Sequence, residues 1–170
     1  MAVTYEPLAT TTLGSAAASV TFSSISGSYT DLVLVVNARS SRTAVSTAPI
    51  NITFNSDTGS NYSNTFLFGN GSTTGSSRGT NANNIYTGDM SSSASSYAGF
   101  ANLLLSINNY SNTTTYKTTI ARCNSANAFA EAVCGLWRST SAINSITITE
   151  GSTNNWVADS TFTLYGIKAA

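Results

Sequence analysis

Any catalysis by this 170-residue chain has to proceed without histidine, because the sequence contains none. Ser-His-Asp and Cys-His nucleophilic machinery and the usual zinc sites are therefore excluded. Glycoside hydrolysis needs only two carboxyl groups on either side of a sugar bond. The available acids are scattered over different segments: Glu6, Asp31, Asp57, Asp89, Glu131, Glu150 and Asp159.

Glu131 and Glu150 are the pair best suited to such a reaction. Glu131 lies among apolar neighbours in an expected strand, and Glu150 ends another. The simpler interpretation is a solvated carboxylate at a strand edge that pairs with Arg122 or Arg138. Walker and dinucleotide-binding fingerprints are absent as well. We therefore expect a protein that is not an enzyme and that uses no cofactor.

The segment from Asn55 to Asn61 places oxygen-bearing side chains at alternate positions, which superficially matches a calcium loop. Its glycine, Gly59, falls at the fifth position instead of the sixth, and Phe66 stands where a calcium loop has its bidentate glutamate. A hairpin loop with Asx-type turns is the favoured interpretation, so no metal site is expected.

Aromatic residues could form a sugar-stacking platform, as in carbohydrate-binding modules. Those inside expected strands, such as Phe66, Phe68 and Trp137, are more simply explained as core residues. Tyr62 and Trp156 lie in polar turns and are the better candidates for exposed contacts. The full set considered for the platform is Tyr62, Phe66, Phe68, Tyr86, Tyr97, Trp137 and Trp156.

The composition limits the possible partners. Serine, threonine and asparagine number 28, 26 and 18, whereas charged residues make up only 8% of the chain. Seven basic residues balance seven acidic ones, so no electrostatic field favours nucleic acid or anionic lipid. No apolar run is long enough to span a bilayer, and the first residues lack a secretory signal, so we expect synthesis in the cytoplasm. In that compartment Cys123 and Cys134 are expected to be free thiols.

The elements that must position these residues are strands. Apolar and polar residues alternate with period two, as in Ile52 and Phe54, and polar turns separate the runs. Many short strands at this length predict a single all-β domain over residues 1–170, an antiparallel β-sandwich and most simply a jelly roll. An immunoglobulin-like sandwich is the competing fold. The runs number about nine: 19–22, 31–38, 50–55, 65–68, 100–108, 116–122, 129–137, 143–149 and 161–167.

Three segments differ from ordinary half-buried strands. Residues 1–16 are expected to be an N-terminal extension or edge segment. Leu32 to Val36 is apolar on both faces, which suits a central strand covered on each side or one whose outer face meets a neighbouring subunit. Residues 69–96 are rich in Gly, Ser, Thr and Asn and predict a long polar surface excursion, with a partner surface as one way to order it.

Several stretches resemble small virion proteins of tailed bacteriophages. They are Tyr5–Leu13 near the start, Tyr29–Leu34, Gly135–Ile146 with its Gly-Leu-Trp-Arg-Ser-Thr opening, and the closing Ser160–Ile167. The resemblance spans most of the chain as a pattern of strands and turns, and no functional residue can be transferred from it. It implies a head decoration, cement or spike protein, or a distal fibre domain that touches the host.

The expected function is therefore that of a capsid decoration or cement protein on the outer surface of the virion. The resemblance implies binding to the major capsid protein or other virion subunits, with three copies assembled as a homotrimer. The alternative is a receptor- or glycan-binding module of a phage spike or tail fibre. The residues expected to contact a partner are Tyr5, Leu8, Leu13, Tyr62, Tyr86 and Trp156.

Overall fold

The expected all-β class is confirmed by the computed structural model, which describes residues 4–96, 99–125 and 128–168. All regular secondary structure within those ranges is β-strand. There are twelve of them, so the expected number of about nine is corrected: β1 (Tyr5–Thr12), β2 (Ser19–Phe22), β3 (Asp31–Ser40), β4 (Thr47–Phe54), β5 (Tyr62–Gly69), β6 (Thr74–Ala82), β7 (Ile85–Ser92), β8 (Ala101–Asn108), β9 (Lys117–Ser125), β10 (Phe129–Trp137), β11 (Ile146–Glu150) and β12 (Thr161–Ile167).

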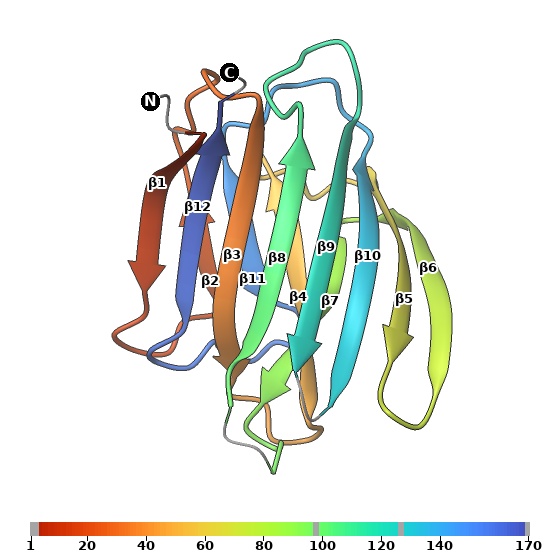
Figure 1. The fold of residues 1–170 in the computed structure, drawn as a ribbon. Coiled ribbons are helices and arrows are strands. Elements are labelled where there is room, and N and C mark those ends of the chain that lie inside the picture. The colour runs from red at the N-terminus through yellow and green to blue at the C-terminus, as the bar shows by residue number, and fades with distance from the viewer. Residues whose placement is uncertain (1–3, 97–98, 126–127, 169–170) are drawn as a thin grey trace.

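The strands lie in two layers (Figure 1). The front layer is antiparallel throughout, in the order β1-β12-β3-β8-β9-β10-β5-β6. The back layer, also antiparallel, has the order β2-β11-β4-β7. A short parallel pairing of Arg39 and Ser40 in β3 with Ser91 and Ser92 in β7 links the layers, so the pairing as a whole is mixed.

The core fills the space between the layers, and period-two alternation creates it. Ile52 and Phe54 in β4 are fully buried, as the sequence pattern predicts, and Ile146 and Ile148 in β11 are buried beside them. The inward side of β3 adds further aliphatic residues that are 0% exposed, namely Leu32, Leu34, Val36 and Ala38. Each layer thus contributes one apolar face, which is the usual way for packed sheets to bury a core.

Three strands lie in segments where the sequence pattern indicated none. β1 is an edge strand that pairs with β12, within the segment expected to be an extension or an edge. The description of residues 69–96 as a surface excursion is wrong, because β6 and β7 fill most of that segment. β6 is an exposed edge strand, but β7 is mostly buried and belongs to the back layer. Small polar residues such as Ser91 and Ser92 fill buried positions in β7, so the segment has no apolar periodicity.

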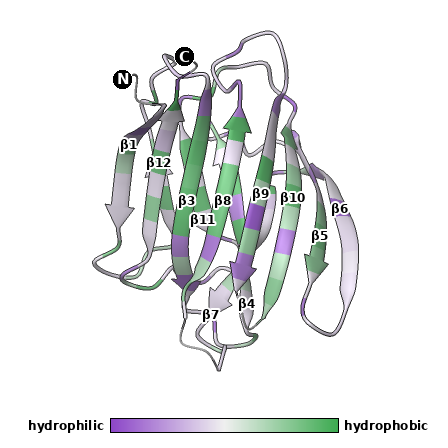
Figure 2. Ribbon diagram, viewed as in Figure 1, coloured by the Kyte–Doolittle hydropathy of each residue, from purple (hydrophilic) through white to green (hydrophobic). Residues whose placement is uncertain are grey.

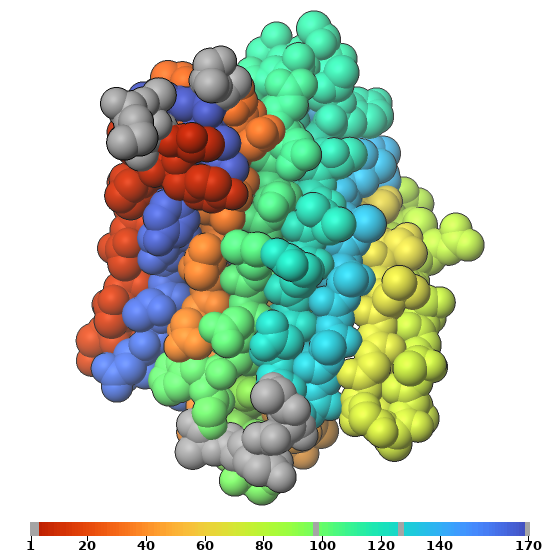
Figure 3. Space-filling model, viewed as in Figure 1, coloured from red at the N-terminus to blue at the C-terminus, as the bar shows by residue number. Residues whose placement is uncertain are grey.

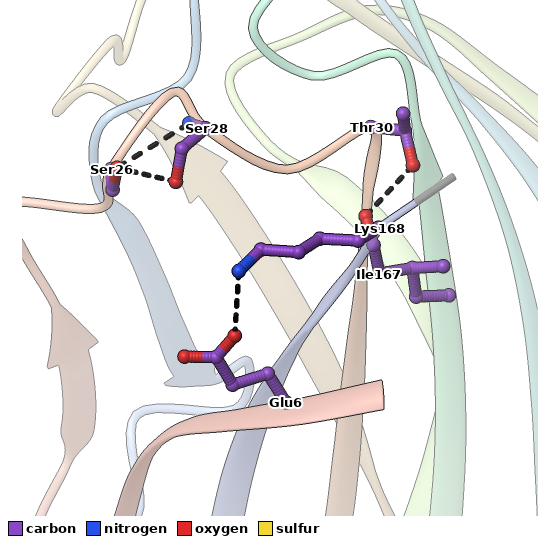
Figure 4. Close-up of polar contacts among 6 residues, drawn as sticks. All are labelled: Glu6, Ser26, Ser28, Thr30, Ile167 and Lys168. Atoms are coloured by element: carbon purple, nitrogen blue, oxygen red, sulfur yellow. Dashed lines mark hydrogen bonds and ion pairs between the residues drawn. The ribbon is translucent and has the colours of Figure 1, made fainter. Parts of the chain in front are cut away.

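The first and last described strands meet at one corner of the front layer. Glu6 in β1 forms an ion pair of 3.1 Å with Lys168, which follows β12 (Figure 4). Close by, the Thr30 hydroxyl donates to the Ile167 carbonyl at 2.7 Å. Both charged side chains are about half exposed, with relative accessibilities of 50% and 42%, so solvent screens the pair. The backbone pairing of β1 with β12 is the main attachment of the edge strand.

Candidate ligand pocket and outer sheet face

The two layers differ in width, and this difference produces a pocket. The back layer ends at β7, whereas the front layer continues through β10, β5 and β6. β10 still packs against β7, whereas β5 and β6 continue the front layer beyond it (Figure 1). A cavity of about 610 Å³ lies in this overhang, and we call it the overhang pocket. Its walls come from β4, β5, β7 and β10 and from the loops beside them: Ser46, Thr47, Phe66, Phe68, Asn70, Ser72, Tyr86, Asp89, Ser95, Ser96, Ala128, Phe129 and Glu131.

One wall of the overhang pocket is aromatic. Phe66 and Phe68 point inward from β5, where they are half-buried because the back layer ends at β7 and covers them only in part. The Phe66 ring lies 4.9 Å from the Tyr86 ring and 6.3 Å from the Phe68 ring, centroid to centroid. Gly75 in β6 makes room for Phe68, since a Cβ at that glycine would lie 2.8 Å from the ring. The wall is therefore a continuous group of packed rings with partly open faces.

Two carboxyl groups lie beside the aromatic wall: Glu131 is the cross-strand partner of Phe68, and Asp89 belongs to β7. The Glu131 carboxylate accepts the Tyr86 hydroxyl at 3.1 Å from each of its oxygens, and its Oε2 accepts the Asp89 backbone N–H at 2.7 Å. Burial is the main cause that raises the pKa of Glu131, and the neighbouring Asp89 charge raises it further. Burial also raises the pKa of the Asp89 carboxyl, although Thr47, Tyr86 and Arg42 act in the opposite direction. The pocket therefore holds two interacting acids in a partly desolvated site.

Gly88 allows β7 to approach this carboxyl group. Its φ is +130°, and a Cβ there would lie 2.4 Å from the Cys123 Cβ and 3.0 Å from Glu131 Oε2. Only glycine adopts that backbone conformation readily and also leaves the space empty. The conformation brings the next peptide N–H, that of Asp89, onto the Glu131 carboxylate. The glycine therefore positions the acidic wall of the pocket.

Glu150 does not join Glu131, so the carboxyl pair suggested by the sequence is not assembled. Its side chain is only 3% exposed in total and lies in the back layer. The Glu150 carboxylate accepts the Ser40 hydroxyl at 2.9 Å and the backbone N–H groups of Ser152 and Asn154, each at 2.8 Å. These bonds make it a fixed acceptor that closes the turn after β11. The acid that accompanies Glu131 is Asp89.

The loop after β4 contains the expected Asx-type turn, but it is not a hairpin loop, because β4 lies in the back layer and β5 in the front layer. The Asp57 carboxylate accepts the Trp137 indole N–H at 2.7 Å, the Asn61 amide at 2.9 Å and the Gly59 backbone N–H at 2.8 Å. The indole hydrogen bond is the largest cause that lowers the pKa of Asp57. Protein donors thus occupy the oxygens that a calcium loop would offer to an ion. Among the described residues, no group of three or more histidine, cysteine, aspartate or glutamate side chains is placed to hold a metal.

Three of the six residues expected to contact a partner are buried. Tyr62 and Trp156 are 0% exposed, so their assignment to exposed contacts is wrong. The Tyr62 hydroxyl accepts the Phe54 backbone N–H inside the core, and Trp156 packs against Phe162. Leu13 is also buried, at 9% exposure, which makes it a core residue instead of a contact.

The other three expected contact residues remain accessible. Tyr5 is 55% exposed, Leu8 is partly buried against the core, and Tyr86 lines the overhang pocket. The seventh aromatic considered for a sugar platform, Tyr97, lies outside the described residues. No sequence signal linked Tyr86 to Asp89, because both lie in the segment that was assigned to a loop.

The outward face of the front layer is the second notable surface, and we call it the outer face. Cross-strand pairing aligns one residue from each of five neighbouring strands: Val35, Leu104, Arg122, Ala132 and Leu67. At about 4.8 Å per strand, this outer row is roughly 19 Å long.

Large apolar side chains are exposed along this face. Leu67 is 62% exposed and Val35 is 37% exposed, and the adjacent Ile120 is 53% exposed. Figure 2 shows the hydrophobic residues of β3, β8, β10 and β5, and Figure 3 shows the same strands side by side across this face. Arg122 lies among these side chains at the centre of the outer row, and exposed apolar residues gathered on one sheet face are typical of an interaction site.

Comparison with known proteins does not identify the chain. No known protein family matches the sequence, and no curated protein matches it significantly. Among the described residues, no helix is long and apolar enough to cross a membrane. The overhang pocket and the outer face are therefore the features of the molecule that point to a function.

Proposed function

We propose that this chain is a structural protein of a bacteriophage virion, most specifically a capsid decoration or cement protein on the outer surface of the particle. It binds the major capsid protein or another virion subunit through the outer face and reinforces the shell by added interface area. The chain acts as a homotrimer without catalytic activity, nucleic acid or membrane. The resemblance of Tyr5–Leu13 and Gly135–Ile146 to phage virion proteins suggests the particle.

The observation that carries this proposal is the exposed outer row. Burying apolar surface contributes roughly 25 cal/mol per Å², so covering a leucine is worth about 1.5–3 kcal/mol. Leu67, Val35 and Ile120 lie on one side of a rigid layer, where a partner can cover them together without loss of backbone freedom. The surrounding threonine and serine side chains lose little rotamer entropy on burial. A flat face of this composition suits a subunit that packs against an assembly.

We further propose that the fold is a jelly-roll β-sandwich, as the strand pattern in the sequence predicts. The support is the pairing order. Taken without β5, β6, β9 and β10, the layers read β1-β12-β3-β8 and β2-β11-β4-β7. Among these eight strands the first pairs with the last, the second with the seventh, the third with the sixth and the fourth with the fifth. A jelly roll, which is a chain wound as two Greek keys, has this pairing. The two remaining hairpin pairs extend the front layer on one side.

A binding assay with particles that lack the protein tests the main proposal. Leu67→Ser and Ile120→Ser are each expected to weaken co-sedimentation with the particles at least about tenfold, which corresponds to about 1.4 kcal/mol. Phe68→Ala is the matched control, because Phe68 follows Leu67 in β5 but points to the opposite face. Equal binding by all variants, or a monomer that is missing from purified particles, contradicts the proposal.

A second candidate function, a glycan-binding receptor module of a spike or tail fibre, is favoured by the overhang pocket. The platform first expected from Tyr62 and Trp156 does not support it, because both are buried. The pocket instead combines half-buried rings with two carboxyl groups and several hydroxyl and amide side chains, and a polyhydroxylated ligand can use ring faces and polar groups together. Titration of the chain with sugars tests this candidate, and the absence of saturable binding to any sugar contradicts it.

A further inference from the structure

The overhang pocket is a concave site, and its side chains belong neither to the fully buried core nor to the outer face. Its Glu131 carboxylate has more acceptor sites than the donors that reach it. Glu131 has two oxygens with about four lone-pair sites when ionised, and the two groups that donate to it are the Tyr86 hydroxyl and the Asp89 N–H. The described residues that line the pocket include no lysine or arginine. A ligand that contacts this carboxylate must therefore supply hydrogen-bond donors.

The aromatic wall adds a second requirement. Phe66, Phe68 and Tyr86 offer ring faces, which carry the negative part of the ring quadrupole and favour weakly positive C–H groups. Because Glu131 is the cross-strand partner of Phe68, a ligand that uses the rings and the carboxyl groups presents hydroxyl donors next to aliphatic C–H groups. A sugar ring has this pair of surfaces. A bare ammonium group would use the carboxyl groups and leave most of the 610 Å³ cavity unfilled.

The two carboxyl groups of the pocket also determine which charge a sugar ligand can carry. Two carboxyl groups in a partly desolvated pocket repel a third, so uronic and sialic acids are disfavoured. Neutral hydroxyls, by contrast, can donate to Glu131 and Asp89 whichever of these acids holds a proton. We propose that the overhang pocket binds a neutral hexose unit, with the ring stacked on Phe68 and Tyr86 and its hydroxyls donated to Glu131 and Asp89. This inference rests on the second candidate function.

The test is a titration of the full chain with glucose, galactose, mannose and their disaccharides, followed by NMR chemical shifts and calorimetry. At least one neutral sugar is expected to bind saturably, with a Kd of about 1 mM for a single unit, which corresponds to about −4 kcal/mol. Phe68→Ala and Glu131→Gln are expected to weaken that binding at least about tenfold. Leu67→Ser is the control and should bind as the unaltered chain does, because it changes the outer face.

Three outcomes overturn the inference. They are no saturable binding of any neutral sugar, tighter binding of glucuronic acid or glucosamine than of every neutral sugar, and unchanged affinity in Phe68→Ala. Since Glu131→Gln removes a buried acceptor, its folding is checked by circular dichroism, and Phe68→Ala decides the result if that variant is unfolded. The particle assay keeps the two proposals apart. Sugar binding without particle binding refutes the decoration role, and particle binding without sugar binding refutes this inference.

Discussion

Replacing Gly88 with alanine should destabilise the fold more than the same replacement at Gly71, the other glycine with a positive φ among the described residues. The new Cβ would lie 2.4 Å from the Cys123 Cβ, well inside van der Waals contact, and it would hold a φ of +130°. Such a backbone conformation costs about 1–3 kcal/mol for a residue with a side chain. Overpacking a core adds about 1–3 kcal/mol. The expected loss is therefore about 2–6 kcal/mol, out of a typical total of about 5–15 kcal/mol.

Gly71→Ala is the matched control for this prediction. Gly71 also has a positive φ, +86°, but an added Cβ would meet nothing within 4 Å. Its loss should be about 1 kcal/mol, so the difference between the two variants measures the close approach of β7 to β9. Urea unfolding followed by tryptophan fluorescence gives both free energies. If Gly88→Ala is no less stable than Gly71→Ala, the description of how β7 reaches Glu131 is wrong.

Three further predictions concern buried groups. Because burial raises the pKa of Asp89, the folded chain holds that proton more tightly than the unfolded chain, and stability from this group falls as pH rises from the unfolded pKa of about 4. Asp89→Asn should therefore gain stability relative to the unaltered chain between pH 4 and 7 in urea unfolding, and a constant difference refutes this. Tyr62→Phe leaves the buried Phe54 N–H without its acceptor and should cost about 1–3 kcal/mol in the same assay. In native protein a thiol reagent should modify the exposed Cys134 at once and the buried Cys123 only after unfolding, so rapid reaction of both thiols contradicts the assigned burial.

The sequence predicted the strands that follow the rule of one apolar face. Ile52, Phe54, Ile146 and Ile148 alternate with polar residues, and all four lie in the core. It did not predict β7, because hydrogen bonds replace apolar contacts at the buried positions of that strand. The Thr87 hydroxyl, for example, donates to a main-chain carbonyl in β4 at 2.9 Å. Residues of this type look like a loop in any hydropathy pattern.

The candidate site was harder to predict than the fold. The sequence singled out Glu131 and Tyr86 separately, but Asp89 reaches Glu131 only because Gly88 brings β7 close to β10. Tyr62 and Trp156 failed as exposed contacts for a related reason. Each is flanked by polar turn residues along the chain, yet its ring turns inward, and neighbours in sequence do not report that direction. Long-range packing decides both cases.

Electron microscopy of phage particles purified from a culture that produces this chain tests the central claim most directly. The account predicts copies of the protein on the outside of the shell, with the outer face of the front layer, including Leu67 and Ile120, against a shell subunit. A reconstruction in which the chain is absent would contradict the account. So would one in which the chain is present with Leu67 and Ile120 facing solvent.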